Sequence, residues 1–205
     1  MKRIFDIWLA AILTAVASPI LIAVTIMVGL LHGRPVLFRQ KRPGLHGELF
    51  DIMKFRTMTN GVNSDGELLP DRERLTKLGS FLRATSLDEL PELFNVLKGD
   101  MSLVGPRPLL PRYMPYFTDR EMARFEVRPG ITGWAQVNGR NNASWDDRMA
   151  MDIWYVENQS LALDLRILAE TALSTIRRRD IVIDPASTML DFDAERRSHG
   201  VKPRD

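Results

Sequence analysis

The segment from Ile7 to Leu31 is apolar, carries no charged side chain and has Pro19 at its centre. As a helix rising about 1.5 Å per residue, it would extend roughly 37 Å, which exceeds the hydrocarbon core of a bilayer at about 30 Å. Pro19 has no amide hydrogen and crowds the carbonyl of Ala15, so a straight helix is disfavoured. The run therefore predicts a membrane helix that breaks at Ser18-Pro19, with the Ser18 hydroxyl able to bond a backbone group freed at the break.

Basic residues flank this run on both sides: Lys2 and Arg3 before it, and Arg34, Arg39, Lys41 and Arg42 after it. Because basic flanks are retained on the cytoplasmic side of a membrane, both ends are expected there, which favours a re-entrant helix. Two other interpretations stay open. One is a kinked single-pass anchor, since proline is tolerated in membrane helices. The other is a cleaved signal peptide, which the basic start, the apolar stretch and Ala15-Val16-Ala17 imitate.

Length and composition limit the number of domains and the kinds of chemistry that the chain can carry. The chain has 205 residues, which allows one domain besides the membrane segment, and we expect that domain over residues 33–185, after a membrane unit at 1–32. The absence of cysteine excludes disulfides, thiolate catalysis and zinc–sulfur sites. A formal net charge of +2 gives no indication of nucleic-acid binding. Six Lys or Arg residues lie between His32 and Arg56, and beside a membrane segment they favour contact with anionic lipid or a phosphorylated ligand, or form a solvated face.

Local patterns predict a small hairpin followed by helices. Strands are expected at residues 36–38 and 49–55, and a helix over 75–83. Ser86-Leu87-Asp88-Glu89 matches a capping box and predicts a helix that runs to Lys98, with Gly99 as its stop, although Pro91 favours a later start. Further helices are expected to begin at Thr118, at Ser144 and at Leu161, and a loose polar tail is expected over residues 186–205.

Asp88 and Glu89 are adjacent carboxylates close to a predicted helix start. Two such acids can hold Mg²⁺, which prefers oxygen ligands and often bridges to substrate phosphates. With the cation present, one carboxylate can approach a phosphate and act as a nucleophile. The simpler interpretation is that both residues only cap the helix.

Two rigid segments rich in Gly, Pro and Arg favour the catalytic interpretation of Asp88 and Glu89 over a simple helix cap. One is Gly105-Pro106-Arg107-Pro108, and the other is Arg128-Pro129-Gly130-Ile131-Thr132-Gly133, followed by Gln136 and Arg140. Arginine binds phosphate through paired hydrogen bonds, and rigid glycine turns present backbone amides to anions. Functional loops on a rigid scaffold are the usual reason for such segments, with solvated turns as the alternative.

Taken together, these residues resemble the small monotopic phosphoglycosyl transferases of bacteria, also called bacterial sugar transferases. The resemblance covers residues 1–180. The segments that carry it are Lys2-Arg3-Ile4-Phe5-Asp6, Ser18-Pro19, Gln40-Lys41-Arg42-Pro43-Gly44, Lys54-Phe55-Arg56-Thr57-Met58, the stretch from Leu82 to Pro91, Gly105-Pro106-Arg107-Pro108, and Arg128-Pro129-Gly130-Ile131-Thr132-Gly133-Trp134. The chain looks most like the short form of the family, some members of which act on diacetylbacillosamine.

The resemblance implies an α+β fold that is mainly helical, with a re-entrant N-terminal membrane helix and a compact cytoplasmic domain carrying amphipathic interfacial helices and a small β-hairpin. It implies a protein on the cytoplasmic face of the bacterial inner membrane, in contact with membrane lipids, that starts glycoconjugate assembly. Its substrates would be a UDP-sugar and polyprenol phosphate. No nucleic-acid partner is implied, and a homo-oligomer stays open.

The same resemblance assigns roles to individual residues. Asp88 would be the nucleophile that forms an aspartyl-phosphosugar and releases UMP, and Glu89 would assist as a Mg²⁺ ligand or base. The remaining site residues would bind or position substrate: Lys54, Arg56, Arg83, Arg107, Pro108, Arg128, Gln136 and Arg140. The alternative is a non-catalytic membrane-associated module that binds lipid or a partner protein through its basic segment.

Overall fold

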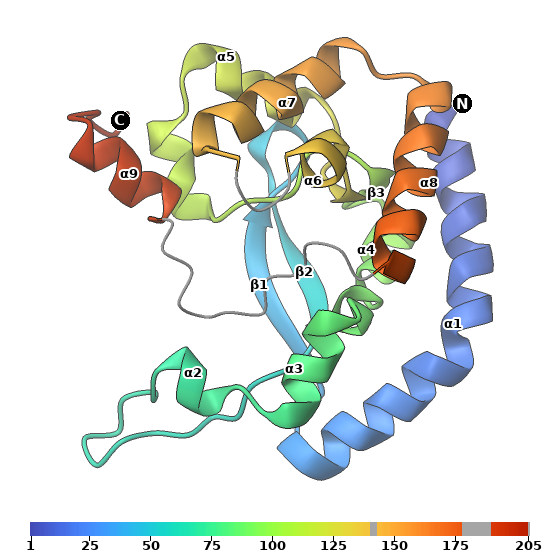
Figure 1. Ribbon diagram of the computed structural model, residues 1–205, viewed down its shortest axis with the longest axis vertical. Coiled ribbons are helices and arrows are strands. Elements are labelled where there is room, and N and C mark those ends of the chain that lie inside the picture. Colours follow the sequence, from blue (N-terminus) through green and yellow to red (C-terminus); the bar gives the residue numbers. More distant parts are fainter. Residues whose placement is uncertain (140–142, 178–189, 205) are drawn as a thin grey trace.

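The computed structural model describes residues 1–139, 143–177 and 190–204. Its first element, α1, runs over Lys2–His32 with Pro19 inside it. The helix is not interrupted, but Figure 1 shows that its ribbon changes direction between its two halves. The Ser18 hydroxyl donates to the carbonyl of Ala15 at 2.8 Å. That carbonyl is the acceptor that the missing amide of Pro19 leaves without a helical partner, so the predicted compensation by Ser18 is confirmed.

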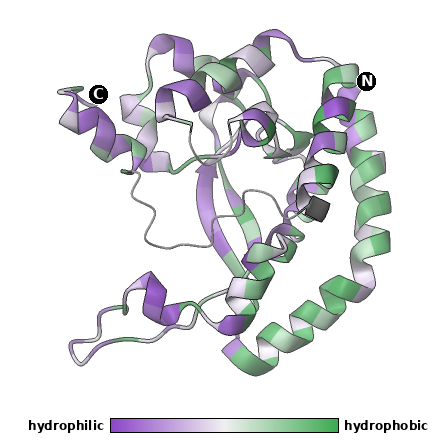
Figure 2. Cartoon of the chain, in the orientation of Figure 1, coloured by the Kyte–Doolittle hydropathy of each residue, from purple (hydrophilic) through white to green (hydrophobic). Residues whose placement is uncertain are grey.

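Both ends of α1 are attached to the rest of the molecule. At its start, Lys2 pairs with the fully buried Asp164 at 2.5 Å, and Arg3 donates to the carbonyl of Val96 at 2.7 Å. At its end, the ring of His32 bonds the carbonyl of Arg56 at 2.9 Å. Figure 2 shows that the helix between these ends is mostly hydrophobic. The basic residues at the start of α1 therefore hold the helix against the domain.

The predicted hairpin is present. Strands β1 (Leu37–Pro43) and β2 (Leu49–Phe55) pair in antiparallel register around the short helix η1 (Leu45–Gly47). Helix α4 (Glu92–Lys98) packs against β2 through the fully buried Asn95, whose amide donates to the Asp51 carbonyl at 2.7 Å and accepts from the Met53 amide at 3.0 Å. This polar contact fixes α4 relative to the hairpin.

The segment between the hairpin and α4 differs from the prediction. After α2 (Asp71–Arg74), helix α3 (Lys77–Ala84) is capped by Thr76, and a separate turn, η2 (Leu87–Glu89), precedes α4. The predicted capping box at Ser86 is wrong, because Ser86 has a φ of 55° and makes no side-chain cap hydrogen bond. The start of α4 after Pro91 is the later start that the proline favoured, and Gly99 ends the helix in left-handed conformation, as expected.

The two Gly/Pro segments meet through a short parallel pair that the sequence analysis missed. Strand β3 (Ser102–Val104) lies beside β4 (Gly130–Thr132), and the amide of Gly105 donates to the Thr132 carbonyl at 2.9 Å. A Cβ atom on Gly105 would lie 2.3 Å from the carbonyl oxygen of Arg128. Glycine is therefore needed here because two backbones approach closely.

The remaining elements of the described residues are helices: η3 (Pro111–Tyr116), α5 (Asp119–Met122), η4 (Ala123–Glu126), α6 (Trp134–Asn138), α7 (Trp145–Glu157), α8 (Leu161–Arg177) and α9 (Phe192–Ser198). The capping boxes at Thr118 and Ser144 are both present. The predicted loose tail is wrong for α9, which packs against η3 with Phe192 fully buried. The molecule is mainly helical with one small antiparallel hairpin, which confirms the predicted α+β class.

Candidate active site

Asp88 lies in η2, the turn held between α3 and α4. The left-handed conformation of Ser86 sets the direction of this turn. Asp88 is buried, with an exposed fraction of 8%. Burial, with a further contribution from the charge of Glu89, raises the pKa of the Asp88 carboxyl to about 6, while the charges of Lys54 and Arg83 oppose this rise. A carboxylate with this environment is poorly solvated and therefore a better nucleophile than one in water.

Glu89 is held by two cations. Its Oε1 accepts from Nζ of Lys54 at 2.5 Å and from Nη2 of Arg107 at 2.6 Å. Burial by itself would raise the pKa of Glu89, but the charges and hydrogen bonds of Arg107 and Lys54 act against it and lower the pKa to about 2. The residue is therefore ionised over the whole physiological range, which makes it a permanent negative charge beside Asp88.

A third carboxylate, Glu92, joins this group from the first turn of α4. Its Oε1 lies 3.2 Å from Nζ of Lys54, and the residue is 1% exposed. Burial, together with the charge of Glu89, raises the pKa of Glu92 to about 7. Glu92 was not predicted as a site residue, although its spacing of three from Glu89 places both on one side of a helical turn.

The other predicted residues fall into distinct places. Pro108 lies next to Arg107 in the first Gly/Pro segment, and its carbonyl accepts from Arg42 at 3.4 Å. Arg83 donates to the Thr57 hydroxyl at 3.1 Å and lies close enough to Asp88 to lower its pKa.

Two predicted arginines lie apart from the carboxylates. Arg128 donates to the carbonyl of Gly99 at 2.8 Å, at the end of α4. Arg56 is buried, and its Nε and Nη1 atoms have no hydrogen-bond partner within the described part of the chain. A substrate role for Arg56 and Arg128 stays a prediction. Arg140 lies outside the described residues.

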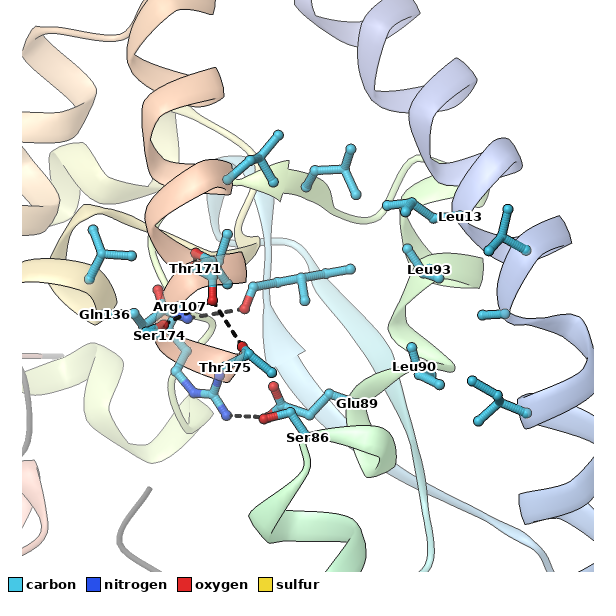
Figure 3. A pocket seen from close by; sticks show the side chains of 18 residues that line it. Leu13, Ser86, Glu89, Leu90, Leu93, Arg107, Gln136, Thr171, Ser174 and Thr175 are labelled. Carbon is cyan, nitrogen blue, oxygen red and sulfur yellow. Dashed lines mark hydrogen bonds and ion pairs between the residues drawn. The ribbon is translucent and has the colours of Figure 1, made fainter. Parts of the chain in front are cut away.

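A cavity of about 550 Å³ opens between α1, α4 and α8, beside this group (Figure 3). Its α1 wall is apolar and includes Leu13, Val16, Ala17 and Ile20. Ser86, Glu89, Arg107 and Gln136 line its polar end, while Asp88 itself is not part of the lining. The cavity therefore joins the apolar surface of α1 to the charged group around Glu89.

The donor set fits a magnesium ion. Among residues 1–139, 143–177 and 190–204, no three His, Cys, Asp or Glu side chains gather as a complete metal site. Mg²⁺, however, is commonly held by one or two carboxylates together with substrate phosphates. Asp88 and Glu89 supply two adjacent carboxylates, and because burial and then the charge of Glu89 raise the pKa of Asp88, a cation bound there would favour its ionised form.

Comparison with known proteins matches residues 1–178 to the bacterial sugar transferases. An uncharacterized sugar transferase of Bacillus subtilis strain 168, EpsL, is 54% identical over 171 residues, covering 83% of this chain and 85% of the relative. The UDP-glucose:undecaprenyl-phosphate glucose-1-phosphate transferase of Caulobacter vibrioides is 42% identical over 185 residues, covering 85% of this chain and 69% of the relative.

A longer relative shows the same match over part of its length. The undecaprenyl-phosphate galactose phosphotransferase of Salmonella typhimurium is 40% identical over 197 residues, which cover 87% of this chain but 41% of the relative. The family match covers residues 1–178 of the 205-residue chain. The chain belongs to the bacterial sugar transferase family.

Proposed function

We propose that this protein transfers a sugar phosphate from a UDP-sugar to polyprenol phosphate, giving a polyprenol-diphosphate-sugar and UMP. The observation that carries this proposal is the position of the Asp88–Glu89 pair, next to a cavity with one apolar wall and one charged end. The names of the relatives from Caulobacter and Salmonella, which act on undecaprenyl phosphate, support the same reaction class. A module that only binds lipid would have no need for a buried carboxylate beside Lys54 and Arg107.

In the proposed first step, a carboxylate oxygen of Asp88 attacks the β-phosphorus of the UDP-sugar. The bond from that phosphorus to the oxygen bridging the two phosphates breaks, and UMP leaves with that oxygen. In the second step, a phosphate oxygen of polyprenol phosphate attacks the same phosphorus, and the bond to Asp88 breaks to restore the carboxylate. Each substrate visits in turn, so ping-pong kinetics are expected.

The surrounding residues support these steps by charge and position. Arg107 donates to Glu89 through Nη2, which leaves its other N–H groups able to bind a phosphate. The Oε1 atom of Glu89 accepts from both Lys54 and Arg107, and these two cations keep the carboxylate ionised, so we assign it as a ligand of Mg²⁺ rather than as a base. When bound, Mg²⁺ would neutralise charge on the transferring phosphate, and Asp88 and Glu89 would hold it.

For the acceptor, we propose that the polyprenyl chain lies in the apolar part of the cavity between α1 and α8. Leu13 and Ile20 of α1 and Leu168 of α8 line that part, while Arg107 lies at the other end, where a phosphate would be attracted. A lipid dissolved in the bilayer can enter along α1, whereas a sugar nucleotide arrives from water. The cavity thus lies between the two phases that supply the substrates.

We further propose that α1 enters the cytoplasmic face of the inner membrane and returns to it. The attachment of both its ends to one domain, through Lys2 with Asp164 and through His32 with Arg56, supports this placement. A helix whose two ends contact the same domain cannot place them on opposite sides of a bilayer.

Cysteine labelling tests this topology, because the chain has no native cysteine. Ile4→Cys and Arg34→Cys place a thiol at an exposed position near each end of α1. Both thiols should resist an impermeant reagent in intact bacteria and react after permeabilisation. Labelling of only one in intact cells would indicate a true span and would refute the re-entrant helix.

The reaction is tested with Asp88→Asn, which removes the nucleophile and keeps the side-chain volume. We expect UMP release from UDP-sugar, polyprenol phosphate and Mg²⁺ to fall by at least about 10³-fold, a loss typical of removing a catalytic nucleophile. Asp119→Asn is the control, since Asp119 lies at the surface in an ion pair with Arg204. A phosphosugar adduct on Asp88, found by mass spectrometry, would support the covalent step, whereas normal turnover by Asp88→Asn would refute it.

A further inference from the structure

A second cavity lies on the other side of the wall formed by Arg107 and Gln136. Its volume is about 310 Å³, and residues of η4, α6 and α7 form much of its lining. No residue of α1 lines it, in contrast to the apolar cavity described above. Arg107 and Gln136 line both cavities, so a molecule in the second cavity can reach the charged group around Glu89.

The second cavity contains a buried cation whose hydrogen bonds are incomplete. Arg124 is 4% exposed, and its Nη2 donates to Asp152 at 2.9 Å and to the carbonyl of Arg107 at 2.7 Å. Its Nε and Nη1 atoms are buried and have no hydrogen-bond partner among residues 1–139, 143–177 and 190–204. Buried donors without partners are costly and uncommon in native structures, so their presence in a cavity lining points to a ligand that accepts hydrogen bonds.

Gln136, which lines both cavities, contributes an acceptor atom to this group of polar atoms. Its Nε2 donates to the Ile131 carbonyl at 3.0 Å, while its Oε1 is buried and accepts no hydrogen bond from the part of the chain that the structure describes. Counted over the described residues, the two lining residues Arg124 and Gln136 thus carry two donors and one acceptor without a hydrogen-bond partner. A group that carries both carbonyl oxygens and an N–H in one ring, such as uracil, would satisfy both kinds of atom.

A further cation lines the cavity from α7. The guanidinium of Arg148 lies over the ring of Trp145 at 5.2 Å from its centroid, and this Trp145 is 9% exposed. The indole also donates to the carbonyl of Leu190 at 2.9 Å, which fixes its position. Arg148 thus has a defined place in the wall. With Arg107 and Arg124 it gives the lining three guanidinium groups against the one carboxylate of Asp152, and this excess of positive charge attracts a phosphorylated ligand.

We propose that the second cavity holds the uridine monophosphate part of the sugar-nucleotide donor, with its phosphate toward Arg107 and its nucleoside toward Arg124 and Arg148. This inference rests on the proposed function and assigns the donor and the lipid acceptor to separate cavities that share one wall. The volume of about 310 Å³ suits a nucleoside and is too small for a whole nucleotide sugar. The sugar would then extend past Arg107 toward Asp88.

The test measures binding of UMP directly, by calorimetry on the full-length protein in detergent with Mg²⁺, separately from turnover. Arg148→Met removes the charge and keeps the length of the side chain. We expect it to weaken UMP binding and to raise the KM for the UDP-sugar, each by about ten-fold or more, as for the loss of one charged hydrogen bond. The KM for polyprenol phosphate should stay within about two-fold of the wild-type value, a range well below the effect of one lost hydrogen bond.

Arg166→Met is the matched control. Arg166 also lies over a tryptophan ring, that of Trp134 at 5.4 Å, but it is on α8 and does not line the second cavity. A second variant, Ala135→Leu, fills the cavity from α6 without removing a charge, and it should also weaken UMP binding. CMP and AMP serve as competitors, and both should bind more weakly than UMP.

The outcomes separate the two proposals. If the wild type releases UMP but Arg148→Met and Ala135→Leu bind UMP like the wild type, the assignment of the second cavity is wrong and the proposed reaction stands. If UMP and AMP bind equally, recognition of uracil in this cavity is wrong. If the wild type turns over no UDP-sugar at all, the proposed function itself is wrong, whatever the binding data show.

Discussion

Lys54 contacts both Glu89 and Glu92, and replacing it should measure how strongly the site depends on it. In Lys54→Met, Glu89 keeps its bond to Arg107 at 2.6 Å. Glu92 loses the ion pair at 3.2 Å, which is its only one among the described residues, and its side chain is 2% exposed. A buried acid without a counter-ion must either stay charged at high cost or take up a proton.

The size of the effect follows from that choice. Removing one partner of a buried ion pair typically costs about 3–5 kcal/mol. Burial and the charge of Glu89 already bring the pKa of Glu92 to about 7, so a proton is readily taken up at neutral pH. We therefore expect the lower end of the range, about 3 kcal/mol, which for a protein of this size lowers Tm by roughly 6–12 °C.

The assay is thermal unfolding followed by tryptophan fluorescence, with every variant in the same detergent at pH 7. Lys41→Met is the matched control on the same hairpin. Lys41 pairs with Asp51 at 3.0 Å, but the two side chains are 60% and 46% exposed, so its loss should cost at most about 1 kcal/mol. The double variant Lys54→Met/Glu92→Gln should recover most of the lost stability, because the neutral amide needs no counter-ion. In a protein of this size, a loss of 1 kcal/mol lowers Tm by about 2–4 °C. If the Tm of Lys54→Met lay within about 2 °C of the Tm of Lys41→Met, this reasoning would be refuted.

Three further predictions concern the scaffold and use the same unfolding assay. Tyr155→Phe should cost about 1–3 kcal/mol, because the hydroxyl donates to the fully buried Asp164 at 2.6 Å, and an unchanged Tm would contradict this. Gly79→Ala should cost at least about 2 kcal/mol, since the new Cβ would lie 1.8 Å from the carbonyl oxygen of Thr57, and a stable variant would show that α3 can move. Phe192→Ala should cost about 3 kcal/mol and release α9 to proteolysis, and equal resistance to protease would show that Phe192 does not hold this helix.

Local signals allowed some elements to be predicted well. The strand at Leu49–Phe55, the helix stop at Gly99 and the caps at Thr118 and Ser144 each depend on residues within a few positions of one another. The same kind of signal was misleading at Ser86. Its capping pattern is real in the sequence, but Pro91 has no amide hydrogen to donate to the carbonyl of Leu87, so the helix begins only at Glu92 and the chain forms a separate turn at Asp88.

Long-range contacts could not be predicted from one sequence. The pairing of β3 with β4 brings Gly105 beside Gly130, and nothing in either short segment indicates the other. Similarly, the pattern around Asp88 predicted a carboxylate pair, but the third acid, Glu92, becomes part of the group only because β2 places Lys54 against α4. The individual residues were predictable as candidates, whereas their partners depended on the fold.

The place of Arg107 between two cavities has a chemical consequence. One of its nitrogens is bonded to Glu89, and a planar guanidinium still presents further N–H groups in fixed directions. It can therefore stay bound to Glu89 while it contacts a phosphate, from the donor in the first step and from the lipid in the second. A lysine could supply the charge but not this fixed geometry. Both steps of the proposed reaction thus depend on Arg107, which can keep its hydrogen bond to Glu89 while one substrate replaces the other.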